Sequence, residues 1–217
     1  MKQIKIISAS QKVNESETDL YKSVTTFSSF IKFYVNNKTG LSEIYNKELT
    51  DENKGKILVY CHDDVTILAN ELYFIDTLNK ALQEYDIVGL AGTIGPITLK
   101  SPTAWHLVSP RETHRGCVYH QKDDKVWATS FGLMPVRALL IDGVFIAINT
   151  KKILEAGLKF DEQFKFHHYD LDFCLAANKL KLKVGVINIP IIHRGLGDSM
   201  FSNDWKESDK RFIQKWA

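Results

Sequence analysis

The sequence has only three cysteines, Cys61, Cys117 and Cys174, and none of them forms a C-x-x-C pair. This spacing excludes a disulfide framework and a zinc ribbon and is typical of proteins from a reducing compartment. No apolar run approaches the ~20 residues that a membrane-spanning helix needs. P-loop, G-x-G-x-x-G and G-x-S-x-G motifs are absent too, which leaves no support for a P-loop enzyme or a serine hydrolase.

The charge and the termini predict an ordinary cytoplasmic protein. The formal net charge of the 217 residues is only +2, which predicts neither a nucleic-acid partner nor a particular oligomeric state. The start, MKQIKIISAS, does not read as a signal peptide. Aromatic residues near the end, among them Trp205 and Phe212, are expected to pack the last helix onto the domain. A peripheral membrane contact through this tail is the alternative.

The most informative segment is GKILVYCHDDV, from Gly55 to Val65. A short apolar run predicts a buried strand, and its carboxyl end delivers His62, Asp63 and Asp64. Ligands of open α/β sheets bind at that end of the strands. Two adjacent carboxylates suit a divalent cation between them. The alternative is that they only cap a following helix, predicted from Ile67 to Leu82.

Three further polar positions lie at the ends of apolar segments. Asp170 and Asp172 are expected at the start of an amphipathic helix, and His193 follows a strand predicted from Val184 to Ile189. Asp142-Gly143 interrupts the apolar run LLIDGVFIAI. A carboxylate there must face a cleft or be hydrogen-bonded, although Asp-Gly between two apolar runs is also a hairpin signal.

Strand and helix patterns alternate along the first half of the chain. Ile4 to Ser8 is expected as a strand, Leu20 to Phe30 as a helix and Phe33 to Asn36 as a second strand. This alternation predicts an α/β fold with a mainly parallel central sheet and helices on both faces. The length suits one domain, over residues 1–217.

The residues resemble those of the family 2 type glycosyltransferases with the GT-A fold, and most closely a short "glycosyltransferase-like" branch from bacterial surface-polysaccharide loci. Three segments carry the resemblance: Gly40 to Val65, Leu139 to Ile153, and Phe160 to Ser199. Their order and spacing make it fairly specific.

The resemblance implies roles for particular residues. The family's metal-binding D-x-D motif falls on His62-Asp63-Asp64, so that Asp64 would contact a divalent metal, Mn²⁺ or Mg²⁺, with His62 and His193 assisting. Asp170 takes the place of the general base, and Tyr169 replaces the usual glutamate before it. Residues expected to bind the donor or acceptor are Ser8, Asn46, Asp63, Trp105, Asp142, Gly143 and Asp172.

The implied activity is the transfer of a sugar from a nucleoside-diphosphate sugar, with UDP-sugars favoured, to a carbohydrate or lipid-linked acceptor in bacterial surface-polysaccharide synthesis. Residues 1–92 would form the donor and metal half, and residues 93–217 the acceptor and catalytic half. Two alternatives remain: a metal-dependent phosphohydrolase that uses the same side chains, and a non-catalytic module that binds sugar nucleotides or glycans.

Overall fold

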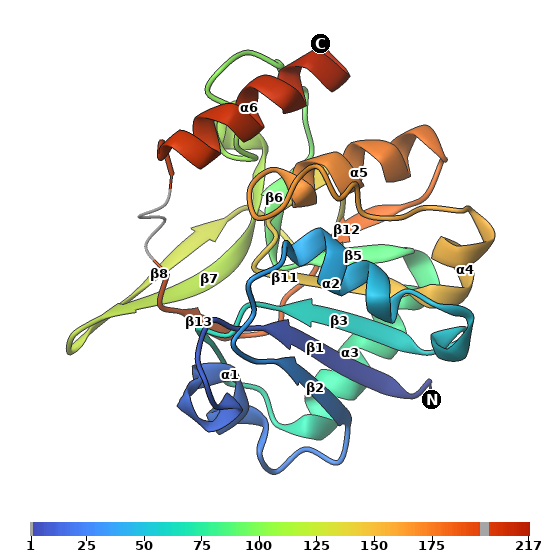
Figure 1. The fold of residues 1–217 in the computed structure, drawn as a ribbon, viewed down its shortest axis with the longest axis vertical. Helices are drawn as coiled ribbons and strands as arrows, with labels where there is room; N and C mark the ends of the chain where they lie inside the picture. The colour runs from blue at the N-terminus through green and yellow to red at the C-terminus, as the bar shows by residue number, and fades with distance from the viewer. Residues whose placement is uncertain (1, 196–199) are drawn as a thin grey trace.

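The computed structural model describes residues 2–195 and 200–217, which form two mixed sheets with helices around them (Figure 1). The strands are β1 (Ile4–Ala9), β2 (Phe30–Tyr34), β3 (Ile57–Cys61), β4 (Val65–Ile67), β5 (Ile87–Gly89), β6 (Ala91–Thr93), β7 (His114–Lys122), β8 (Lys125–Phe131), β9 (Val136–Ala138), β10 (Leu140–Ile141), β11 (Phe145–Asn149), β12 (Val184–Val186) and β13 (Ile191–His193). The helices are α1 (Asp19–Val24), α2 (Leu41–Glu48), α3 (Glu71–Glu84), α4 (Thr150–Glu155), α5 (Tyr169–Lys179) and α6 (Asn203–Trp216), with three short 3₁₀ turns, η1 (Glu15–Glu17), η2 (Asp51–Asn53) and η3 (Arg111–Thr113).

The α/β class is confirmed, but the prediction of a mainly parallel sheet is wrong. In the seven-stranded sheet, ordered β2-β1-β3-β11-β5-β12-β9, β11 runs antiparallel to both of its neighbours. The second sheet is ordered β10-β6-β7-β13-β4, with β8 paired to β7, and it is antiparallel except between β7 and β13. The β7–β8 pair is antiparallel because its two-residue link is too short for the crossover that parallel neighbours need. The orientation of β11 is set by its pairing with β3 and β5, which are distant from it in the sequence.

Two predicted helices are shorter or begin later than expected. The helix from Leu20 ends at Val24, and Phe30–Tyr34 is a strand, as its aromatic and β-branched side chains favour. The helix predicted from Ile67 begins at Glu71, where the Asn70 side chain accepts a hydrogen bond from the Tyr73 amide. Asp63 and Asp64 therefore do not cap it, and the capping alternative is wrong.

Aromatic side chains pack on both faces of the seven-stranded sheet. On one face, Tyr45 of α2 packs on Tyr60 of β3, with ring centroids 4.3 Å apart. On the other, Phe74 of α3 meets Phe145 of β11 edge to face. Figure 1 shows α2 in front of this sheet and α3 behind it. The polar ends of β1 and β3 are thus held between two packed layers.

The last helix, α6, is fixed to the domain by apolar and polar contacts. Trp205 and Phe212 are buried, as predicted for the tail. The Asp209 carboxylate accepts hydrogen bonds from Ser101 and from the backbone and hydroxyl of Thr103. This anchoring brings α6 over the N-terminus of α5 (Figure 1).

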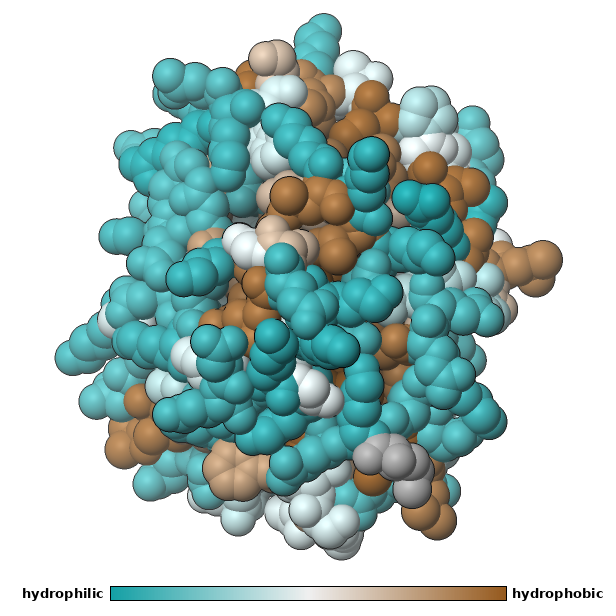
Figure 2. Space-filling view, turned by 90° about the vertical axis from the view of Figure 1, so that its right-hand side faces the viewer, coloured by the Kyte–Doolittle hydropathy of each residue, from teal (hydrophilic) through white to brown (hydrophobic). Residues whose placement is uncertain are grey.

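Figure 2 views the molecule from the side where the chain begins and β1 starts, and hydrophilic side chains cover most of it around separate apolar patches. The carboxyl ends of β1 and β3 point to the opposite side (Figure 1). Within the described residues, no helix combines the length and apolar character needed to cross a membrane.

Candidate active site

The carboxyl ends of β1, β2 and β3 open into a cleft of about 980 Å³. Its walls come from the segments that follow these strands, including Ser10, Thr39 and Asp63, and from Glu207 and Arg211 of α6. The parallel strands β2, β1 and β3 lie side by side, so their polar ends meet at one edge. This is the position at which open α/β sheets bind ligands.

Asp63 lines this cleft and is held from β1. The Ser10 hydroxyl donates a hydrogen bond to the Asp63 carboxylate, and the Asp63 carbonyl accepts one from the Leu20 amide. Ser8, two residues earlier on β1, is fully buried, and its hydroxyl has no hydrogen-bond partner within the described structure. The sequence-predicted residues Ser8 and Asp63 therefore both lie near the carboxyl end of β1, with Asp63 at the cleft.

His62, Asp64 and His193 converge next to the cleft. One ligand atom from each lies within 4.8 Å of the others. His62 follows β3, Asp64 precedes β4, and His193 ends β13, which pairs with β4 so that His193 is opposite Val65. This pairing brings together side chains that are about 130 positions apart in the sequence. Gly195 lies so close that a Cβ there would be 2.7 Å from both Asp64 Oδ2 and His193 Nε2.

The three groups differ in protonation. Burial lowers the pKa of His62, which keeps its imidazole neutral. Burial also opposes the charge of His193, but its contact with Asp64, 3.5 Å from Nε2 to Oδ1, raises the pKa of His193. The pKa of Asp64 is lowered despite its burial, mainly through His193. The pair thus favours an imidazolium beside a carboxylate.

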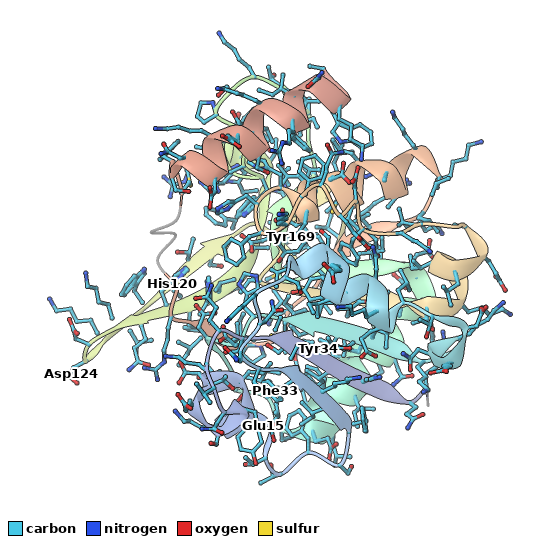
Figure 3. All side chains as sticks on the ribbon, viewed as in Figure 1. Glu15, Phe33, Tyr34, His120, Asp124 and Tyr169 are labelled. Atoms are coloured by element: carbon cyan, nitrogen blue, oxygen red, sulfur yellow. The ribbon has the colours of Figure 1, made fainter. Side chains whose placement is uncertain are left out.

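Tyr169 joins this cluster to the Asp142-Gly143 segment. Its hydroxyl donates to the Gly143 carbonyl at 2.8 Å and lies 3.0 Å from His62 Nε2. Because the hydroxyl has one proton, His62 Nε2 must be the donor in the second bond. The remaining nitrogen of His62, Nδ1, therefore keeps a free lone pair. Figure 3 shows Tyr169 near the centre of the molecule, beneath α6.

Asp170 lies on the other side of Gly143. Its carboxylate accepts a hydrogen bond from the Gly143 amide at 2.9 Å. Burial, followed by the charge of Asp142, raises the pKa of Asp170 to about 7. Asp142 itself accepts hydrogen bonds from Trp105 Nε1, at 2.6 Å, and from the Val144 amide, at 2.8 Å. Its flanking strands β10 and β11 belong to different sheets, so the hairpin alternative for Asp142-Gly143 is wrong.

Two of the predicted binding residues use their polar groups elsewhere. The Asn46 amide bonds to the backbone of Phe160 and to Glu162, which ties α2 to the segment before α5. The Asp172 carboxylate accepts hydrogen bonds from Lys215 and Trp216, and so holds the end of α6. Neither side chain joins the cluster around Asp64. Trp105, another of the predicted binding residues, is nearly buried, and its Nε1 donates a hydrogen bond to Asp142.

Sequence reasoning missed the connecting roles of Tyr169, Ser10 and Gly195. In the sequence, Tyr169 stands out only because it replaces a glutamate, whereas in the structure its hydroxyl pairs with His62. Ser10 and Gly195 carry no local signal, because their contacts depend on strands that are distant in the sequence.

The residues present fit a divalent metal. Asp64 Oδ1 is buried and has no close hydrogen-bond partner among the described residues, and it faces two imidazoles. A neutral imidazole with a free lone pair and an ionised carboxylate are both metal ligands, and His193 would have to lose its proton to become the third.

Comparisons with known proteins identify a family model, a curated relative and a solved structure that are similar to this chain. The family model described as "Glycosyltransferase like family" matches residues 25–216. A curated relative from Fuscovulum blasticum, named "ATP synthase subunits region ORF 6", is 24% identical over 180 residues, which are 79% of this chain and 65% of that protein. A197 from STIV, in its crystal structure, matches 86% of this chain over 82% of its own, with a TM-score of 0.49 and 10% identity. Because the family model covers most of the sequence, the chain belongs to the glycosyltransferase-like family.

Proposed function

We propose that this chain is a metal-assisted glycosyltransferase. It transfers the sugar of a nucleoside diphosphate sugar, with UDP-sugars favoured, to a glycan or lipid-linked acceptor, in the cytoplasm and for bacterial surface-polysaccharide synthesis. One observation carries the proposal: a single tyrosine, Tyr169, contacts both His62 and Gly143, whose amide donates to Asp170. Metal-type ligands and a carboxylate with a raised pKa are therefore adjacent.

The donor is assigned to the first half of the chain, residues 1–92. Its nucleotide would lie in the cleft at the ends of β1, β2 and β3, where Ser10 and Thr39 offer hydroxyl groups. Arg211 of α6 lines the same cleft and pairs with Glu207, and the further cations of the lining, Lys12, Lys38 and Lys165, suit a phosphate. Residues 93–217 contribute the base and the acceptor side.

His62, Asp64 and His193 would hold the metal ion. When bound, a divalent cation stabilises the negative charge that develops on the departing diphosphate. Two imidazoles in the ligand set favour Mn²⁺ over Mg²⁺, because Mg²⁺ strongly prefers oxygen ligands. Tyr169 would keep Nδ1 of His62 available by accepting the hydrogen bond from Nε2.

Asp170 acts as the general base. The acceptor hydroxyl oxygen forms a bond to the anomeric carbon, the bond from that carbon to the diphosphate breaks, and the hydroxyl proton moves to the Asp170 carboxylate. A pKa of about 7 suits this role near neutral pH. Attack on the side opposite the departing diphosphate inverts the anomeric configuration.

The test is a transfer assay with radiolabelled sugar nucleotides, Mn²⁺ and a panel of glycan and lipid-linked acceptors, on the parent, Asp170→Asn and Asp76→Asn. Asp76 lies on the exposed surface of α3, so Asp76→Asn makes the same chemical change away from the site and is a matched control. The parent and Asp76→Asn should transfer sugar, and Asp170→Asn should be about 10²–10⁴-fold slower. Nucleotide binding without transfer in the parent would support a binding module instead, and equal rates in the parent and Asp170→Asn would remove Asp170 from the reaction.

A further inference from the structure

The β7–β8 hairpin projects from the body of the molecule, with Asp124 at its tip and His120 nearer the sheet (Figure 3). Opposite residues on the two strands place His120 beside Trp127, Val118 beside Thr129, and Gly116 beside Phe131 on one face. The rings of His120 and Trp127 are stacked, with centroids 5.6 Å apart and planes 27° apart. Trp127 keeps 43% of its surface exposed.

Halfway along the hairpin, this face meets the candidate active site, because His120 lies beside His193. His120 pairs in register with His193 of β13, and their ring centroids are 6.4 Å apart. Three adjacent strands, β8, β7 and β13, thus present Trp127, His120 and His193 side by side. His193 belongs to the cluster with Asp64.

The end of the same face that lies nearest the body of the molecule is linked to the Asp142 carboxylate. Phe131 packs edge to face on His114 and on Trp105, with centroids 5.3 and 6.2 Å apart. Trp105 Nε1 donates to Asp142, whose charge contributes to the raised pKa of Asp170. The aromatic face of the hairpin is therefore connected to the metal-type cluster through His193 and to Asp142 through Trp105, and Asp142 precedes the glycine whose amide binds Asp170.

The chemistry of this face suits an uncharged sugar. From the His120–Trp127 pair to the Gly116–Phe131 pair, this face carries no lysine, arginine, aspartate or glutamate. Lys122 and Lys125, the pair next to the turn, lie on the same face beyond Trp127, at the end away from the site. An exposed indole offers a flat apolar face with a polar edge beside it, which matches the apolar face and hydroxyl edge of a sugar ring. A phosphate or an anionic membrane would require cationic side chains between Trp127 and Phe131, where this face has none.

We propose that the Trp127–His120 face binds the acceptor, and that this acceptor is a neutral oligosaccharide of at least two sugars. The sugar that receives the transferred group lies at Asp170, and a sugar further along the acceptor stacks on Trp127. This inference rests on the proposed function, and it narrows the acceptor from any glycan or lipid-linked molecule to one with a neutral saccharide chain.

The test compares Trp127→Ala with Trp127→Phe and with Val126→Ala. Val126 is 54% exposed on the same strand, and its side chain points to the opposite face of the hairpin, which makes it a matched control. Binding is measured by titration calorimetry with neutral trisaccharides (maltotriose, cellotriose, chitotriose and mannotriose), and separately with UDP and Mn²⁺. Trp127→Ala should weaken trisaccharide binding by about fivefold or more, Trp127→Phe should retain most of it, and Val126→Ala should match the parent. UDP affinity should be the same in all four proteins.

The measurements separate this proposal from the proposed function. Trisaccharide binding that depends on Trp127, in a protein that transfers no sugar, would support saccharide binding at the Trp127–His120 face and contradict the transferase function. Equal trisaccharide binding by the parent and Trp127→Ala, or no binding of any trisaccharide by the parent, would overturn the proposal that the Trp127–His120 face binds the acceptor. So would a Trp127→Ala variant whose only defect is in binding to anionic lipid vesicles or in self-association.

Discussion

The hydroxyl of Tyr169 provides the most informative perturbation. Replacing Tyr169 by phenylalanine keeps the ring, which packs against Tyr45 and Phe160, and removes only the bonds to His62 and Gly143. The Gly143 carbonyl and the His62 N–H would then be left without these partners. A buried polar group that loses its partner costs about 1–3 kcal/mol, so the two together should cost about 2–6 kcal/mol of unfolding free energy.

For a chain of this size, 1 kcal/mol corresponds to about 2–4 °C in Tm, so Tyr169→Phe should melt roughly 10 °C lower. Tyr73→Phe is the matched control, because the Tyr73 ring is exposed and its hydroxyl makes only a 3.5 Å contact with Asn188. That variant should melt within about 1 °C of the parent.

A second assay tests the tautomer of His62 directly. In the parent, ¹⁵N NMR of the imidazole should show His62 protonated at Nε2, and this preference should be lost in Tyr169→Phe. Affinity for Mn²⁺ should fall about 10–100-fold in the same variant. A parent protein with the proton on Nδ1, or a Tyr169→Phe variant with unchanged Tm and Mn²⁺ affinity, would refute the reasoning.

Three further predictions concern single residues. Transfer by the parent should rise with pH around an apparent pKa near 7, since Asp170 must be ionised to accept a proton, and a pH-independent rate between pH 5.5 and 8.5 would contradict this. Burial lowers the pKa of His168 to about 4, below its unfolded value, so its contribution to stability is present above about pH 6.5 and lost as the pH falls toward 4. Denaturant titrations should show a loss of up to roughly 3 kcal/mol over that window, and His168→Asn, which tolerates the left-handed backbone there, should flatten it. Gly143→Ala would place a Cβ 2.3 Å from the Tyr169 hydroxyl, so it should lower Tm and Mn²⁺ affinity together, and an unchanged melting curve would show that the contact relaxes freely.

The sequence predicts where polar side chains gather better than it predicts the order of the strands. The run before His62 is apolar throughout, and such a run, followed by polar residues, marks both a buried strand and the edge where ligands bind. Sheet order has no comparable local signal. Nothing in the residues of β11 indicates that it inserts antiparallel between β3 and β5, because that choice depends on pairing between distant segments.

The pairing of residues within the site shows the same limit. His62 and Tyr169 are two separate departures from the acidic pattern that the resemblance implies, whereas the structure shows a hydrogen bond between them. Asp172 illustrates the reverse case. Asp172 is only two residues from the proposed base in the sequence. The helical rotation between positions 170 and 172 turns its carboxylate toward Lys215 and Trp216.

A metal-assisted donor site is tested by calorimetric binding of UDP to the parent and to Asp64→Asn, each with and without Mn²⁺. Mn²⁺ should strengthen UDP binding to the parent, Mg²⁺ should do so less, and Asp64→Asn should lose the metal-dependent part. Asp76→Asn should behave as the parent does. Metal-independent UDP binding, or the same dependence on Mn²⁺ in Asp64→Asn, would contradict a metal-assisted donor site at His62, Asp64 and His193.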